Sequence, residues 1–135
     1  MCLTKICKKD VVLKKDMIVK KVVDTDEEGN LYFGTIVSTD LKDSNKKQLV
    51  QFGLNTPNVQ EVIAVFRPNN TSYYISGFHC YLDKKSDKEI YKMWYLSQHH
   101  TEKIVEFTIP AGTKVTVGNE GHHGSTVIVT QLLKY

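Results

Sequence analysis

Histidines are the first residues in this sequence whose chemistry could serve catalysis or metal binding. Four of the five stand as adjacent pairs, His99-His100 and His122-His123, and the fifth is His79. Adjacent residues of a strand point to opposite faces, so a pair rarely directs both rings at one metal ion. A metal site needs three or four ligands in fixed geometry, and neither an H-x-x-x-H nor an H-x-H spacing occurs. The sequence therefore predicts no metal site and no metal cofactor.

A second group of residues suits ligand contact better than catalysis. His79 lies on an aromatic segment just before an expected helix, where the ends of sheet and helix commonly build a pocket. It is interpreted either as a half-buried histidine whose ring nitrogens are hydrogen-bonded within the protein or as a ligand contact. Arg67 is the only arginine and would be a bidentate partner for a phosphate, although it could equally cover a strand edge. His122 and His123 stand between two glycines, so we expect them in an exposed loop whose backbone can approach a ligand.

No motif with a known catalytic mechanism is present. The sequence lacks a nucleophile elbow, a P-loop, a G-x-G-x-x-G turn and an H-E-x-x-H helix. We therefore predict no catalytic residues and no cofactor. A small metal-independent phosphodiesterase or nuclease remains an alternative, in which His79, Glu106 and Arg67 would act as acid, base and phosphate clamp.

Length and composition are those of an ordinary globular protein. A chain of 135 residues with 41% hydrophobic and 24% charged residues is expected to form one domain spanning residues 1–135. It contains no run of about 18 apolar residues, and its first residues do not read as a secretory signal. The three cysteines have no C-x-x-C spacing and are interpreted as reduced thiols. We expect a cytoplasmic protein that does not interact with a membrane.

Positive charge is concentrated at the beginning of the chain. Residues 1–21 hold seven lysines against two aspartates. Such a stretch could approach a polyanion through its field, but it is more typical of the solvated face of a strand. Seventeen of the eighteen basic residues are lysines, whereas base readout depends heavily on bidentate arginine. We therefore expect no sequence-specific binding to nucleic acid.

Short strand-like segments separated by glycine, asparagine and aspartate predict an antiparallel sheet. Residues 17–23 and 31–37 are expected to form a hairpin around the charged turn at 24–30. In 73–82, Gly77 indicates a bulge or a close approach of another group. The expected strands cover residues 17–23, 31–37, 48–52, 59–66, 73–82, 103–109, 113–117 and 126–133.

One helix is expected over residues 87–98. Ser86 and Glu89 have the spacing of a capping box, in which each side chain binds a free amide of the first turn. Ile90, Met93 and Trp94 then fall on one stripe with Ser97, which predicts an amphipathic helix lying on the sheet. The expected fold class is therefore α+β, mainly antiparallel β-sheet with one amphipathic helix packed on it.

Four short features together resemble a known family. These are Met1-Cys2-Leu3 at the start, the aromatic run 77–81 before the expected helix, Ile109-Pro110-Ala111-Gly112, and a closing strand. In this layout the chain is similar to small phage-encoded proteins of the anti-Thoeris sponge family, which sequester cyclic ADP-ribose-type signals. The resemblance implies a phage anti-defence protein that acts in the cytoplasm of an infected bacterium and binds a nucleotide-derived signal without cleaving it.

A sponge of this kind would need aromatic surfaces for a base or ribose and cations for a pyrophosphate. The aromatic candidates are Phe78, Tyr74 and Tyr81, and the cationic ones are Arg67 and Lys114. Exposed strand edges of a small sheet would also suit a homo-oligomer. A virion or assembly component without a small-molecule site is a further alternative.

Overall fold

The computed structural model describes residues 3–33, 48–58, 60–86, 88–90, 102–120 and 125–135. Almost all of these residues belong to strands. The strands are Leu3–Val12 (β1), Met17–Thr25 (β2), Leu31–Phe33 (β3), Gln48–Leu49 (β4), Leu54–Asn55 (β5), Val62–Arg67 (β6), Asn70–Ile75 (β7), Phe78–Leu82 (β8), Glu102–Ile109 (β9), Lys114–Glu120 (β10), Ser125–Thr130 (β11) and Leu133–Lys134 (β12).

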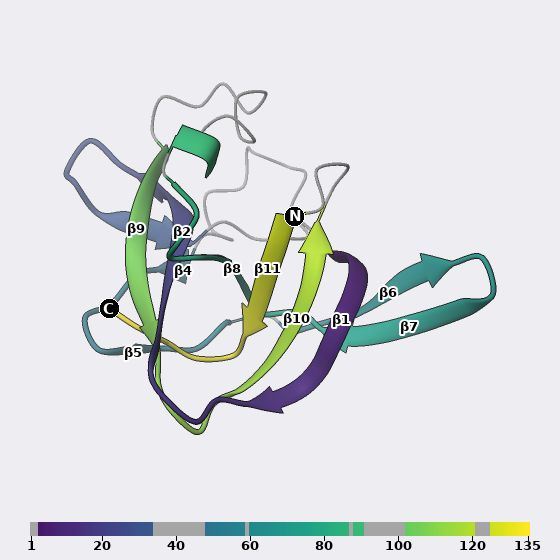
Figure 1. Ribbon diagram of the computed structural model, residues 1–135. Helices are drawn as coiled ribbons and strands as arrows, with labels where there is room; N and C mark the ends of the chain where they lie inside the picture. Colours follow the sequence, from purple (N-terminus) through teal and green to yellow (C-terminus); the bar gives the residue numbers. More distant parts are fainter. Residues whose placement is uncertain (1–2, 34–47, 59, 87, 91–101, 121–124) are drawn as a thin grey trace.

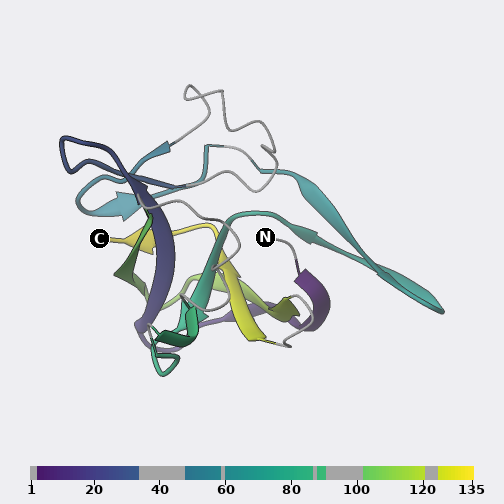
Figure 2. The same ribbon diagram turned by 90° about the horizontal axis from the view of Figure 1, so that it is seen from above.

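Ten of these strands form one antiparallel sheet, and two form a separate hairpin. The order in the large sheet is β1-β10-β11-β8-β2-β9-β12-β5, with β3 pairing with β2 and β4 pairing with β3. This sheet curves strongly around the centre of the molecule (Figure 1). Strands β6 and β7 pair only with each other among the described strands and project from the body as a long arm (Figures 1 and 2).

Two turns of the large sheet lie side by side at the corner where the sheet bends. The turn between β1 and β2 is bonded to the turn between β9 and β10: the Leu13 amide donates to the Thr113 carbonyl at 3.0 Å, and the Gly112 amide donates to the Leu13 carbonyl at 2.7 Å. Gly112 has a φ of +86°, which an L side chain rarely adopts. The turn at Gly112 lets paired strands β1 and β10 continue around a corner into paired strands β2 and β9.

The concave side of the sheet encloses the first of two hydrophobic cores. Aromatic side chains lie at its centre, where the ring of Phe33 packs against Phe78 and Phe107 with centroid distances of 4.4 and 5.5 Å. Branched aliphatic residues complete it, including the fully buried Val19 and Ile109.

The second core covers the opposite face of β8 and β11. Side chains alternate along each strand, so Ile128 enters the first core whereas Val127 and Val129 enter the second. The arm covers this face with Val65 and Tyr74. Strands β8 and β11 are therefore buried on both faces, which explains why almost every residue in them is buried.

The expected α+β class is wrong. Of the described residues, 65% are in strands and 3% are helical, and no helix of seven or more residues occurs among them. The helix start is confirmed in part: the Ser86 hydroxyl accepts a bond from the Glu89 amide at 3.2 Å, as one half of the capping box requires, and residues 88–90 are helical. The rest of the expected helix, residues 91–98, lies outside the described residues. In the part of the chain that the structure describes, no helix is long and apolar enough to cross a membrane.

The lysine-rich stretch 1–21 agrees only in part with the solvated-strand interpretation. The three lysines of β1 are exposed, whereas Lys20 and Lys21 of β2 are only partly exposed. The segment expected as one strand over 73–82 is split at Gly77 into β7 of the arm and β8 of the large sheet. A Cβ at Gly77 would overlap the backbone oxygen of Thr130, so the expectation of a close approach at this glycine is confirmed.

The hairpin expected from residues 17–37 is confirmed as far as the structure describes it. Strands β2 and β3 pair antiparallel around the turn that Asp26 closes. Its carboxylate accepts bonds from the amides of Glu28 at 2.9 Å and Asn30 at 2.8 Å. These bonds, with that from the Asn30 side chain first in importance, hold the pKa of Asp26 below its ordinary value.

Candidate ligand-binding groove

A groove of about 380 Å³ lies where the base of the arm meets strands β1, β10 and β11. Its volume is within the range of about 300 to 1,000 Å³ that is usual for small-molecule sites. Its polar and aromatic wall is formed by Lys9, Asp10, Tyr73, Lys114, Thr116 and Gln131. Its apolar part is formed by Val62, Tyr74, Ile75 and Val129.

Three elements position the polar groups of this groove. Strand β1 contains register shifts between Lys8 and Val11, and Asp10 within that stretch has a φ of +56°. Such a bulge bends the strand and redirects its side chains, which places Lys9 and Asp10 at the groove. Lys114 begins the neighbouring strand β10, where it pairs with Val12.

The arm supplies the aromatic side of the groove and is held in place by polar contacts. Tyr73 is 53% exposed, so part of its ring is available for stacking. Gln131 fixes the base of the arm by donating to the Ser76 carbonyl at 2.9 Å and by accepting from the Gln60 side chain at 2.7 Å. The groove therefore combines two lysines and one aspartate with an accessible ring.

A buried hydrogen-bond chain lies behind the groove. The Tyr74 hydroxyl accepts from the Leu3 amide at 3.1 Å and lies 3.1 Å from Nε2 of His79. Nδ1 of the same ring lies 3.2 Å from the Gly77 carbonyl, which can only accept. The neutral tautomer with its proton on Nδ1 satisfies all of these bonds, with Tyr74 donating to Nε2. Both ring nitrogens of His79 are thus occupied.

The electrostatic environment keeps His79 neutral. Burial is the main cause, and the positive charge of Lys21 adds to it, so that the pKa of His79 falls to about 3. The Lys21 ammonium itself donates to the His79 carbonyl at 2.9 Å. Burial lowers the pKa of Lys21, while the nearby Cys80 and Glu120 act in the opposite direction.

Glu120 forms the other side of this polar cluster. Its Oε1 accepts a short hydrogen bond from the Tyr81 hydroxyl, whereas its buried Oε2 has no partner among the described residues. Burial raises the pKa of Glu120, and the bond from Tyr81 and the charge of Lys21 partly offset that rise. Lys85 lies nearby and donates to the Ser125 hydroxyl at 3.2 Å.

The structure brings some of the residues predicted to bind a ligand together and separates others. Tyr74 and Lys114 both line the groove. His79 and Tyr81 lie in the buried cluster beneath the arm, with side chains 1% exposed. Phe78 points into the first core instead, against Phe33.

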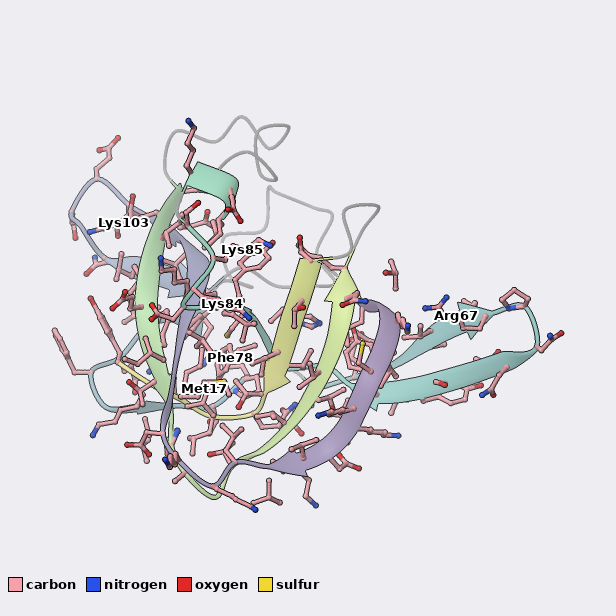
Figure 3. The ribbon with its side chains drawn as sticks, viewed as in Figure 1. Met17, Arg67, Phe78, Lys84, Lys85 and Lys103 are labelled. Carbon is pink, nitrogen blue, oxygen red and sulfur yellow. The ribbon has the colours of Figure 1, made fainter. Side chains whose placement is uncertain are left out.

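Arg67 stands apart from the other predicted residues. It is the last residue of β6, and Figure 3 shows it on the projecting arm, well away from Phe78 in the body. His122 and His123 lie outside the described residues, so their predicted role stays a prediction.

Sequence reasoning missed several residues of the groove and of the buried polar cluster around His79 and Glu120. Lys9 and Lys21 were visible only as part of a lysine-rich stretch, and nothing in the local sequence singles out Asp10 or Gln131. Glu120 lies beyond the strand expected over 113–117, but it ends strand β10. No local signal could have found these residues, because each becomes distinctive only beside a distant strand.

Cysteine and metal chemistry have little support in the described part of the chain. Cys7 is exposed and Cys80 is buried, and both are free thiols. Burial raises the pKa of Cys80 to about 11, which keeps it protonated and unreactive at neutral pH. No group of three or more histidine, cysteine, aspartate or glutamate side chains that could hold a metal ion occurs among residues that the structure describes.

Comparison with known proteins adds no identification to this geometry. No family model matches the sequence, and neither a curated protein nor a solved structure matches the chain.

Proposed function

We propose that this protein binds a nucleotide-derived, anionic small molecule in the groove at the base of the arm and holds it without cleaving it. The observation that carries the proposal is the combination of Lys9 and Lys114 with the partly exposed ring of Tyr73 in one groove of nucleotide size. Lysine ammonium groups bind phosphate as point charges, and a tyrosine face stacks on a base. Asp10 adds a carboxylate that can accept from ribose hydroxyls or base amino groups.

The resemblance to anti-Thoeris sponges makes cyclic ADP-ribose isomers the first ligands to test. In this proposal the protein acts in the cytoplasm of an infected bacterium and lowers the free concentration of an immune signal. Sequestration requires tight binding and no chemistry, and the two lysines and the tyrosine ring of the groove are groups that bind phosphates and bases.

The decisive experiment follows the fate of the ligand. Purified protein would be titrated with cyclic ADP-ribose isomers by calorimetry, then denatured, and the released small molecules identified by mass spectrometry. The sponge proposal predicts binding and recovery of the intact ligand. Recovery of a hydrolysed product would establish the phosphodiesterase alternative instead, and the absence of binding to any cyclic or linear nucleotide would refute both.

Substitutions in the groove test its position. Because a hydrogen bond to a charged group is worth about 1.5 to 3 kcal/mol, Lys114→Ala should weaken binding roughly tenfold or more. Tyr73→Ala should weaken binding to a similar degree, since stacking on an aromatic ring contributes about 1 to 3 kcal/mol per base. Calorimetry with the same ligand measures both effects.

Lys134→Ala is the matched control for the lysine substitution. Lys134 is an exposed lysine on β12, in the part of the sheet next to the C-terminus and away from the arm (Figure 1). Its loss removes the same charge from the protein without touching the groove. Equal weakening by Lys134→Ala and Lys114→Ala would show that net charge, and not the groove, determines affinity.

A further inference from the structure

The arm formed by β6 and β7 presents a face without a partner among the described residues. Along one face, the exposed fractions are 70% for Val62, 80% for Phe66, 53% for Tyr73 and 55% for Ile75. These residues are neighbours, because Val62 pairs with Ile75 and Phe66 lies two residues beyond Ala64, which pairs with Tyr73. An isolated two-stranded hairpin is marginally stable in water, and such an apolar face is typical of a surface that another protein covers.

No described strand is hydrogen-bonded to the outer edge of β6, although β1 contacts this strand. The Ser76 amide donates to the Glu61 carbonyl at 2.7 Å, which shows that the odd-numbered residues of this segment bond toward β7. The backbone N–H and C=O groups of Val62, Ala64 and Phe66 therefore point to the outer edge. An uncovered edge of this kind is a ready template for pairing with another strand.

We propose that β6 pairs antiparallel with β6 of a second copy of this chain, around a two-fold axis at Ala64. Hydrogen-bonded partners must both direct their backbone groups to the outer edge, so only even-numbered residues can face one another across it. With Ala64 opposite itself, Val62 lies opposite Phe66 of the second copy. The two arms then form one four-stranded sheet, in which their exposed apolar faces are continuous.

Charge complementarity favours a second copy of this chain as the partner of β6, and it favours the register centred on Ala64. Glu61 stands just before β6 and Arg67 ends it, and both are odd-numbered residues on the same face of the arm. In the proposed register, Glu61 of each copy lies opposite Arg67 of the other, which gives two ion pairs across the axis. A slip of two residues in either direction would separate both pairs. Opposite charges that face each other across strands are stabilising, and like charges are destabilising.

A disulfide cross-link tests the axis directly. In a variant with Cys2→Ser and Cys7→Ser, Ala64→Cys should form a covalent dimer under mild oxidation, because Cα atoms of a hydrogen-bonded pair lie about 5.5 Å apart, within the span of a disulfide. Thr71→Cys in the same background is the control, since Thr71 is an exposed residue of the other strand of the arm. Failure of Ala64→Cys to cross-link faster than Thr71→Cys would overturn the proposed axis.

Reversal of the two charges tests the register on the full chain. The unmodified protein should sediment as a dimer, and Arg67→Glu or Glu61→Arg alone should weaken dimerisation roughly tenfold, because each places like charges opposite one another. The double variant restores both pairs with reversed sign and should regain the original dimer affinity. Rescue would exclude misfolding as the cause of the single-variant effects. A wild-type protein that stays monomeric at every accessible concentration, or a double variant without rescue, would overturn the proposal.

Discussion

At the scale of single residues, His79 was predicted as a possible ligand contact, but its ring is held in place by hydrogen bonds within the protein. Both of its ring nitrogens have partners, Tyr74 on one side and the Gly77 carbonyl on the other. The same Tyr74 lines the groove. The contribution of His79 is therefore to orient a groove residue through hydrogen bonding, which is a positioning role that depends on the neutral ring.

This neutrality predicts a pH dependence of stability. Unfolded His79 takes up a proton near pH 6.5, whereas the folded ring has a pKa of about 3. Between these values the unfolded state binds more protons, so stability is lost as the pH falls, by about 1 kcal/mol per pH unit. His79→Gln removes this titration, and the stability advantage of the wild type over the variant should shrink by about 2 kcal/mol from pH 8 to pH 5. Urea unfolding at several pH values measures it.

The control for this prediction is Tyr74→Phe, which removes the hydroxyl but leaves the histidine. That variant should lose stability at all pH values and keep the wild-type slope between pH 6.5 and 5. Parallel profiles for the wild type and His79→Gln would show that another group governs acid sensitivity.

At the scale of elements, the curvature of β1 depends on a close approach to β10. Strand β1 contains three register shifts against β10, and Gly118 of β10 lies close against the backbone of Lys5. A Cβ at Gly118 would overlap the backbone oxygen of Lys5 and lie 2.8 Å from a methyl carbon of Leu3. The glycine therefore lets β1 wrap closely against the sheet, and β1 in turn carries Lys9 and Asp10 to the groove.

Replacing Gly118 should lower the free energy of unfolding more than replacing a glycine in a turn. We expect Gly118→Ala to lower the free energy of unfolding by about 2 to 3 kcal/mol, because backbone atoms must shift to admit the methyl group. Gly112→Ala has open space around its Cβ and only an unfavourable φ of +86°, so its cost should be about 1 kcal/mol. Denaturant unfolding of both variants gives the ranking, and the reverse order would show that β1 can move away from β10 at little cost.

At the scale of the whole molecule, two cores are built on opposite faces of the same central strands. Ile128 contributes to the core on the concave side, and Val127 contributes to the core beneath the arm. Both side chains are at most 2% exposed. The stability of the arm base and the groove is therefore coupled to the main sheet through β8 and β11.

Truncation on either face of β11 should consequently destabilise the whole protein. Ile128→Ala should cost about 2 to 5 kcal/mol, and Val127→Ala about 2 kcal/mol, from lost burial and the cavity that remains. Thr126→Ala, at a partly exposed position of the same strand, is the control and should change stability by less than about 0.5 kcal/mol. Circular dichroism during urea unfolding would measure all three. If Val127→Ala were as mild as Thr126→Ala, the second core would contribute little to folding.

Local sequence patterns alone determined much of the element content. Alternating side chains and turn residues predicted the strand-rich antiparallel sheet and the hairpin closed at residues 24–30. The capping contact between Ser86 and Glu89 was also predictable, because it joins residues three apart. The helix expected beyond it led to the wrong fold class, since a capping box and an apolar stripe do not reveal how much of the chain the surrounding sheet will use.

Only the tertiary structure decided which strands became neighbours and which side chains met. The segment 73–82 reads as one strand, yet it is divided between the arm and the large sheet because the Thr130 backbone passes against Gly77. The groove joins residues from β1, β6, β7, β10 and β11 with Gln131, which follows β11, and Lys9 and Gln131 are 122 positions apart. Strand order depends on the burial of two faces at once, a property of the packed sheet that no local pattern along the chain contains.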